Sequence, residues 1–202
     1  MNANVGMAYP VASKVNAYTV GTSITYLAGN RLAEAVSANI SWNRADGHFF
    51  GDDVELDSDN GITGYSIDFE PSGFTDAIRA GLLGEVAVGS SSATYYDLVD
   101  TAAPDHGFGY IRVMRSKAVG SAGAASTSYD AWWFYKGKFS ISSEETRTKE
   151  QSMEWRVPTL TFTGSGVSID STGVLKFAAH KSFTSLADAK TWLNNSARGN
   201  IS

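Results

Sequence analysis

Acidic residues between Asp52 and Asp59 form the densest group of side chains that could do chemistry. Five carboxylates lie in this stretch with no base among them: Asp52, Asp53, Glu55, Asp57 and Asp59. Alternating carboxylates can bind calcium, but an EF-hand loop needs Gly at its sixth position and Glu at its twelfth. Counted from Asp53, those positions hold Ser58 and Gly64. The pattern therefore favours a solvated acidic loop, with weak adventitious cation binding as the minor alternative.

Motifs of other catalytic classes do not occur in the sequence. The three histidines, His48, His106 and His180, lack the HxH or HxxxH spacing of a zinc site. No GxSxG sequence marks a serine nucleophile, and Gly164-Ser165-Gly166 lacks the lysine of a phosphate-binding loop. A carboxylate pair for glycoside hydrolysis would be assembled by the fold, and nothing singles one out. We therefore predict a non-enzyme without catalytic, cofactor-binding or metal-binding residues.

Composition points to a globular protein. The chain has 202 residues, 43% of them hydrophobic and 12% aromatic, which is enough for a substantial core. The absence of cysteine excludes disulfides and thiolate metal sites. A net charge of −5 argues against a dedicated nucleic-acid binder, which needs clustered Lys and Arg. The N-terminus shows no signal-peptide pattern, and the longest uncharged stretch, residues 15–30, is too polar to span a bilayer.

Alternation of apolar and polar residues predicts a mainly β chain. In the segment 32–42, the even positions from Val36 to Trp42 are apolar and the odd positions between them are polar. In residues 62–70, Thr63, Tyr65, Ile67 and Phe69 are expected on one face, with Asp68 and Glu70 on the other. Further strands are expected at 18–20 and 24–27 (a hairpin), 93–100, 107–117, 132–142, 148–163 and 174–178.

Two short helices are expected. After Pro71 the apolar residues recur every fourth position, at Phe74, Ile78 and Leu82. Ser72 is available to cap this helix, and Gly84 can adopt the left-handed conformation that ends it. A second helix is predicted from Ser185 to Asn195, because Leu186, Ala189 and Leu193 share one face.

Four consecutive aromatic residues, Trp132 to Tyr135, admit two interpretations. Exposed rings form stacking platforms in carbohydrate-binding and single-strand-binding domains. Consecutive aromatics in a strand more often fill both faces of a buried sheet, and we favour that interpretation. The alternative function is glycan binding by a β-sandwich module that uses Trp132 or Trp133. A less favoured alternative is a hydrolase with an unrecognised carboxylate pair.

Several segments, taken in order, resemble a known family. Residues 107–113, GFGYIRV, are similar to a strand of the major tail tube proteins of bacterial viruses with long, non-contractile tails. Residues 135–140, YKGKFS, resemble that family's next strand. Residues 146–155, TRTKEQSMEW, followed by Val157-Pro158-Thr159-Leu160, are similar to a third stretch. The acidic segment, alternating strand and helix fit the same template, so the resemblance covers roughly residues 30–163.

The resemblance implies a fold and a function. A member of this family would be a mainly β, single-domain β-sandwich or barrel with a short flanking helix. Six subunits would close into a ring, with the inner strands forming one continuous barrel. The rings would stack into the tail tube, the conduit for genome ejection. The expected location is the virion tail, and the host cytoplasm during assembly.

The expected partners are copies of the chain itself, a tape-measure protein and tail-terminal proteins, with no membrane. Viral DNA would pass through the lumen without specific binding, because a lumen lined by Asp, Glu, Ser and Asn repels phosphate. Asp68 and Glu70 are the predicted lumen-facing carboxylates.

The expected organisation is one domain, residues 1–202, with three special segments: a flexible N-terminal arm at 1–12, a long acidic inter-ring loop at 46–61, and the helix at 185–195. Rings would be held in register by ionic contacts. The predicted acidic side chains are Asp52, Asp53 and Glu55, and the predicted basic ones are Arg147, Lys149 and Arg156. The small-residue loop at 118–128 looks like an insertion peculiar to this chain.

Overall fold

The computed structural model describes residues 2–32, 34–45, 47–51, 54–59, 61–73, 75–89, 94–99, 102–116, 126–143 and 159–201. The elements in chain order are β1 (Asn2–Thr19), β2 (Ser23–Tyr26), β3 (Asn30–Arg31), β4 (Ala35–Arg44), β5 (Gly47–Gly51), β6 (Val54–Asp59), β7 (Ile62–Pro71), α1 (Asp76–Leu83), β8 (Val86–Val88), β9 (Tyr95–Asp97), β10 (His106–Ser116), β11 (Ser126–Ser143), β12 (Thr159–Ser165), β13 (Ala178–Phe183) and α2 (Leu186–Asn194). The prediction of a mainly β fold is confirmed. No helix of the described residues is long and apolar enough to cross a bilayer.

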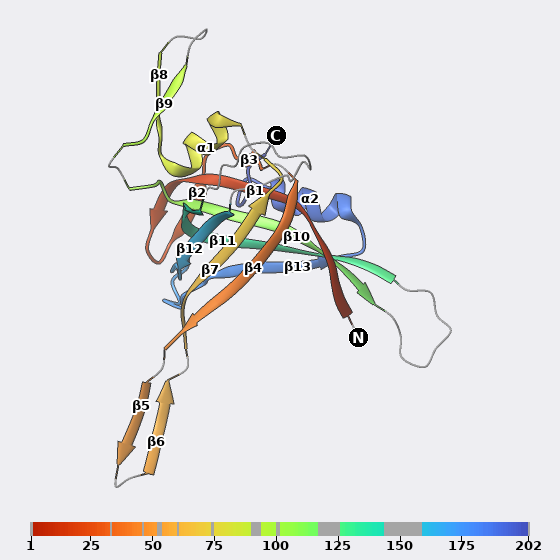
Figure 1. The fold of residues 1–202 in the computed structure, drawn as a ribbon. Helices are drawn as coiled ribbons and strands as arrows, with labels where there is room; N and C mark the ends of the chain where they lie inside the picture. Colours follow the sequence, from red (N-terminus) through yellow and green to blue (C-terminus); the bar gives the residue numbers. More distant parts are fainter. Residues whose placement is uncertain are drawn as a thin grey trace, which may run out of the picture.

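One large antiparallel sheet organises the fold. Its strand order is β2-β1-β10-β11-β12-β7-β4, with β3 added beside β1 and β13 beside β11. Strand β11 is long enough to pair twice along the same edge, first with β13 and then with β12. Two hairpins, β5–β6 and β8–β9, stand apart from this sheet and project from the molecule in different directions (Figure 1).

The sheet curves around an aromatic inner cluster. Its buried members come from both halves of the sheet: Ala12, Leu32, Tyr65, Ile67, Phe69, Leu82, Phe108, Tyr110, Phe134, Phe139, Leu160 and Phe162. Met7 of β1 and Ile40 of β4 both pack against it, although these strands lie near opposite ends of the strand order. The sheet must therefore fold over on itself to bury one shared set of rings.

Helix α2 covers the other face of β10 and β11. This outer cluster joins Ala189 and Leu193 of α2 to Ile111 and Trp133, with Val11, Tyr26 and Ala131 as further buried members. Trp133 and Phe134 are both fully buried but belong to different clusters. The interpretation of the aromatic run as filling both faces of a buried sheet is confirmed.

Both predicted helices are present, with one correction at a cap. The N-cap of α1 is Thr75, whose side chain accepts from the Ile78 amide, and not Ser72. The helix ends as expected at Gly84, whose backbone is left-handed with φ 79°. Helix α2 begins after Ser185, whose hydroxyl accepts from the Ala187 amide.

Several segment predictions need correction. Residues 2–12 do not form a free arm, because they belong to β1 and pair with β10 and β3. Most of the predicted 46–61 loop is the β5–β6 hairpin. The strand expected at 174–178 lies later, at Ala178–Phe183, and Val174 is exposed. The 93–100 strand is the shorter β9, and residues 144–158 lie outside the described part of the chain.

A bulge in β11 marks the point where its pairing changes. His106 pairs with Gly137 and Phe108 with Phe134, so Tyr135 and Lys136 together oppose a single residue of β10. The extra residue reverses the side-chain alternation of β11. Even-numbered Phe134 faces the inner cluster before the bulge, whereas odd-numbered Phe139 faces it afterwards.

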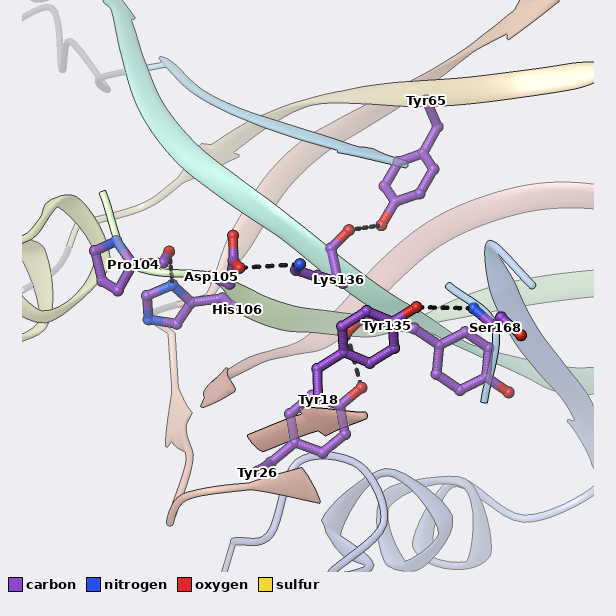
Figure 2. Close-up of polar contacts among 9 residues, drawn as sticks. All are labelled: Tyr18, Tyr26, Tyr65, Pro104, Asp105, His106, Tyr135, Lys136 and Ser168. Atoms are coloured by element: carbon purple, nitrogen blue, oxygen red, sulfur yellow. Dashed lines mark hydrogen bonds and ion pairs between the residues drawn. The ribbon is translucent and has the colours of Figure 1, made fainter. Parts of the chain in front are cut away.

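Two tyrosine hydroxyls satisfy the backbone at this bulge. Tyr26 donates to the Tyr135 carbonyl at 2.8 Å, and Tyr65 donates to the Lys136 carbonyl, also at 2.8 Å. They reach β11 from opposite sides (Figure 2). Trp133 donates its indole N–H to the Tyr26 oxygen at 3.2 Å. Burial raises the pKa of both tyrosines, so both remain protonated donors at neutral pH.

We expect Gly164→Ala to destabilise the fold by about 2 kcal/mol. A Cβ at this position would lie 2.3 Å from the Lys136 carbonyl oxygen and 2.4 Å from the Tyr65 hydroxyl. Urea unfolding measures the effect. Gly6→Ala is the matched control in β1, because a Cβ there meets nothing within 4 Å. Equal stability of the two variants would contradict the tight packing of this junction.

Candidate assembly surfaces

A sheet face with two central rows of polar side chains is the most distinctive surface of the described structure. It is formed by β4, β7, β12 and the last third of β11. Two cross-strand rows run across it: Asn39, Asp68, Thr161 and Ser140, and then Ser41, Ser66, Thr163 and Lys138. None of these side chains is buried, and both helices pack on other surfaces. We call this surface the polar face.

Short polar side chains and few charges characterise the polar face. Thr161 donates to Asp68 at 2.8 Å, and Ser37 donates to Glu70 at 2.9 Å. The carboxylates predicted to face a lumen, Asp68 and Glu70, thus lie on one surface, as the alternation required. Lys138 is the one positively charged side chain among the eight residues of the two rows. The face is suited to solvent contact and offers no apolar platform for a tight ligand.

The four strands of the polar face have two unpaired edges among the described residues. On one side β4 pairs only with β7. On the other side β11 leaves β10 at Gly137, and no described strand pairs there with residues 138–143. Unpaired edges readily accept a strand from another chain. Both edges of the polar face are therefore candidate assembly surfaces.

The proposed ionic contact between rings falls largely outside the described residues. Glu55 lies on β6, but Asp52, Asp53, Arg147, Lys149 and Arg156 are not among the residues that the structure describes. The hairpin that carries Glu55 continues the β4–β7 pair, since the Ala45 amide donates to the Gly61 carbonyl at 2.8 Å. Strands β5 and β6 thus stand at the end of the polar face, and the ionic role of the acidic side chains stays a prediction.

Titratable side chains do not gather into a catalytic or metal site in the described structure. No group of three or more His, Asp or Glu residues there is placed to hold a metal ion. His106 is buried beside the Pro104 carbonyl at 2.9 Å, next to the ion pair of Asp105 and Lys136 (Figure 2). His180 lies elsewhere, on β13.

The tryptophans offer little support for a stacking platform. Trp133 is fully buried, so it cannot receive a sugar ring. Trp132 is half-buried and stacks on His180 with centroids 4.7 Å apart, while the Arg112 guanidinium lies 4.6 Å from its ring. Its indole N–H donates to Asp130 at 2.6 Å. Side chains of the same sheet already contact the ring of Trp132.

Comparison with protein-family models, with curated proteins and with solved structures gives no match to this chain.

We expect acid to destabilise the fold through His106. Burial lowers its pKa below the ordinary value of 6.5, so the unfolded chain binds a proton more readily than the folded one. This contribution to stability is complete above pH 6.5 and is lost as the pH falls below that value towards the folded-state pKa. Urea unfolding from about pH 8 to about pH 5 should show a weaker pH dependence for His106→Gln than for wild type.

His180→Gln is the control, because it removes a histidine whose side chain is 60% exposed. A His106→Gln variant with the same pH dependence as wild type would contradict the assignment.

Proposed function

We propose that this chain is a structural protein that assembles with copies of itself into rings, which stack into a tube that conducts nucleic acid. The specific form that the sequence motifs favour is the tail tube of a bacterial virus with a long, non-contractile tail, built from hexameric rings. The observation that carries the proposal is the polar face, four strands wide, uncovered by either helix and bounded by two edges with which no described strand pairs.

The polar face has the surface chemistry of a channel wall. Serine, threonine and asparagine side chains keep water at the wall, and Asp68 and Glu70 add negative charge. DNA phosphates would be weakly repelled and would find no cluster of Lys or Arg to bind. A wall of this kind permits passage without adhesion, which a conduit requires.

Strand direction favours closure into a ring. The four strands alternate in direction, so β4 runs antiparallel to β11. If the edge of β4 meets the edge of β11 in the next copy, the new pair is again antiparallel. Head-to-tail repetition then closes a continuous barrel and leaves no exposed edge. In this arrangement the polar faces of all copies lie on the same side of the wall.

We expect lysines on the edge strand to block ring closure. The variant Asn39→Lys with Ser41→Lys places two charges on β4, and charged edges resist pairing with another chain. It should remain a folded monomer under conditions in which wild type forms rings or tubes. Negative-stain electron microscopy and circular dichroism provide the two readouts.

The control variant is Ser66→Lys with Thr161→Lys, which adds the same charge to inner strands of the polar face. It should still assemble. If wild type forms neither rings nor tubes at high concentration, the proposed function is wrong.

The acidic segment gives a separate prediction about stacking. Replacing Asp52, Asp53 and Glu55 with Ser should leave a folded protein that forms tubes slowly, because charged rims steer and register assembly. High salt should slow wild-type assembly in the same way. Light scattering during tube growth measures the rate. Tubes that form at the wild-type rate would show that this segment does not contribute to stacking.

A further inference from the structure

Two groups of exposed apolar side chains lie at opposite ends of the polar face. At one end, Asn43, Gly64 and Ser165 lie side by side on β4, β7 and β12. The chain beyond Asn43 and before Gly64 forms the β5–β6 hairpin, and the chain after Ser165 forms the loop at 166–177. The ends at Pro71 and its partner Ala35 lie at the other extreme, and Pro71 leads to α1 and β8–β9. Figure 1 shows β5–β6 and β8–β9 projecting from opposite ends of the molecule.

The loop at 166–177 and the β1–β2 turn form one composite surface, which we call the loop patch. The Gly21 amide donates to the Ser168 carbonyl at 2.8 Å, and the Ser168 amide donates to the Tyr18 hydroxyl at 3.0 Å. Three strongly exposed aliphatic side chains lie on the loop patch: Val20, Val174 and Leu175.

The loop patch is held in one conformation by its own contacts. Asp170 accepts from the amide and hydroxyl of Thr172 and from the Lys176 ammonium, and these hydrogen bonds lower the pKa of Asp170 to about 2. Val167 and Lys176 close the base of the loop through two backbone hydrogen bonds. Val174 and Leu175 are therefore presented by an ordered loop, which reduces the entropy that a partner must overcome on binding.

The β8–β9 hairpin presents the second apolar group. Its exposed members are Val86, Tyr95, Leu98 and Val99, with Leu98 78% exposed. A two-stranded hairpin in water is marginally stable unless it packs on something else. The base of this hairpin is tied to α1, since the Gly84 and Glu85 amides both donate to the Ala80 carbonyl and Glu85 pairs with Arg79 at 3.1 Å. No part of the chain that the structure describes covers these four side chains.

Most charged side chains at the two surfaces are paired within the monomer. Residues 84–99 contain two acids, Glu85 and Asp97, and no base. Lys176 and Lys136 flank the loop patch, and each is paired with a carboxylate: Lys176 with Asp170, and Lys136 with Asp105. In the hairpin, Glu85 is paired with Arg79. The charges of Glu85, Lys176 and Lys136 are thus compensated within the monomer, so contact between the two surfaces is governed by their apolar side chains.

We propose that the β8–β9 hairpin of one copy docks on the loop patch of a second copy stacked along the strand direction of the polar face. The two surfaces are unlike and lie at opposite ends of the same strands, so the contact is heterologous and repeats without closing. It supplies an apolar stacking contact between successive rings, in addition to the ionic one. This inference rests on the proposed self-assembly but concerns stacking alone.

Serine substitutions test the contact by electron microscopy. Tyr95→Ser with Leu98→Ser, and separately Val174→Ser with Leu175→Ser, should retain rings and lower the yield of stacked assemblies about tenfold, the loss expected from one removed apolar anchor. Val5→Ser is the matched control, because Val5 is also exposed but lies on β1, outside both surfaces. Stacks of normal length in either double variant would overturn the inference and leave the proposed function intact.

Crosslinking tests the same contact without relying on assembled rings. The chain has no cysteine, so Leu98→Cys and Val174→Cys each introduce a single thiol. A short bis-maleimide should join a mixture of the two proteins into dimers, and should join neither protein alone. If either protein alone crosslinks as much as the mixture does, the contact is not between two different surfaces and the inference is wrong. If wild type forms no rings, crosslinking restricted to the mixture still supports the inference, and its absence rejects it.

Discussion

The backbone of β11 at Tyr135 and Lys136 is the constraint on which the two cores depend. The two carbonyls lie at the bulge between the two hydrophobic clusters, where an unsatisfied buried acceptor would cost about 1–3 kcal/mol. Tyr26 and Tyr65 donate hydrogen bonds to these carbonyls from opposite faces. Each tyrosine belongs to a different hydrophobic cluster, so the hydrogen bonds at one bulge tie the inner and outer clusters to the same strand.

The same junction explains why one sheet carries surfaces of different character. Before the bulge, the outer face of β11 holds Trp133 under helix α2, and after it the outer face holds Lys138 and Ser140 in solvent. Strand pairing changes at the same place, from β13 to β12. A helix-covered half and an uncovered polar half can therefore share one continuous strand, which gives a single small domain both a core and a solvent-exposed wall.

Much of this fold could be predicted from the sequence where a face is either clearly buried or clearly polar. Tyr65, Ile67 and Phe69 alternate with polar residues and are fully buried, because the period of two fixes their face. Helix α2 was placed within a residue at each end, since its cap and apolar stripe agree. Polar and apolar residues also alternate in β12, where Thr159, Thr161 and Thr163 are separated by Leu160 and Phe162. This pattern predicts that the three threonines lie together on the polar face.

Other features depend on contacts that a local pattern does not contain. The first residues of β1 lack a strong apolar pattern, yet they are strand because β10 offers an edge. Acidic residues are rare in strands, so the sequence of the β5–β6 hairpin predicts a loop. Val174 and Leu175 suggested a strand because they are apolar, but a loop presents them to solvent. The bulge in β11 cannot be predicted from the sequence, because the four adjacent aromatic residues show no apolar–polar alternation that a bulge would interrupt.

The bulge also limits how the gene for this protein can change. An inserted residue inverts every side chain beyond it, so removing one residue near Tyr135 would turn Phe139 and Ile141 outward and Lys138 and Ser140 inward. Insertions or deletions within β11 are therefore tolerable only in pairs, or where a second change restores the phase. By contrast, hairpin tips and surface loops can gain or lose single residues freely. Related chains should accordingly differ in length at their projecting hairpins and agree, residue for residue, in the spacing between the Trp133–Phe134 pair and Phe139.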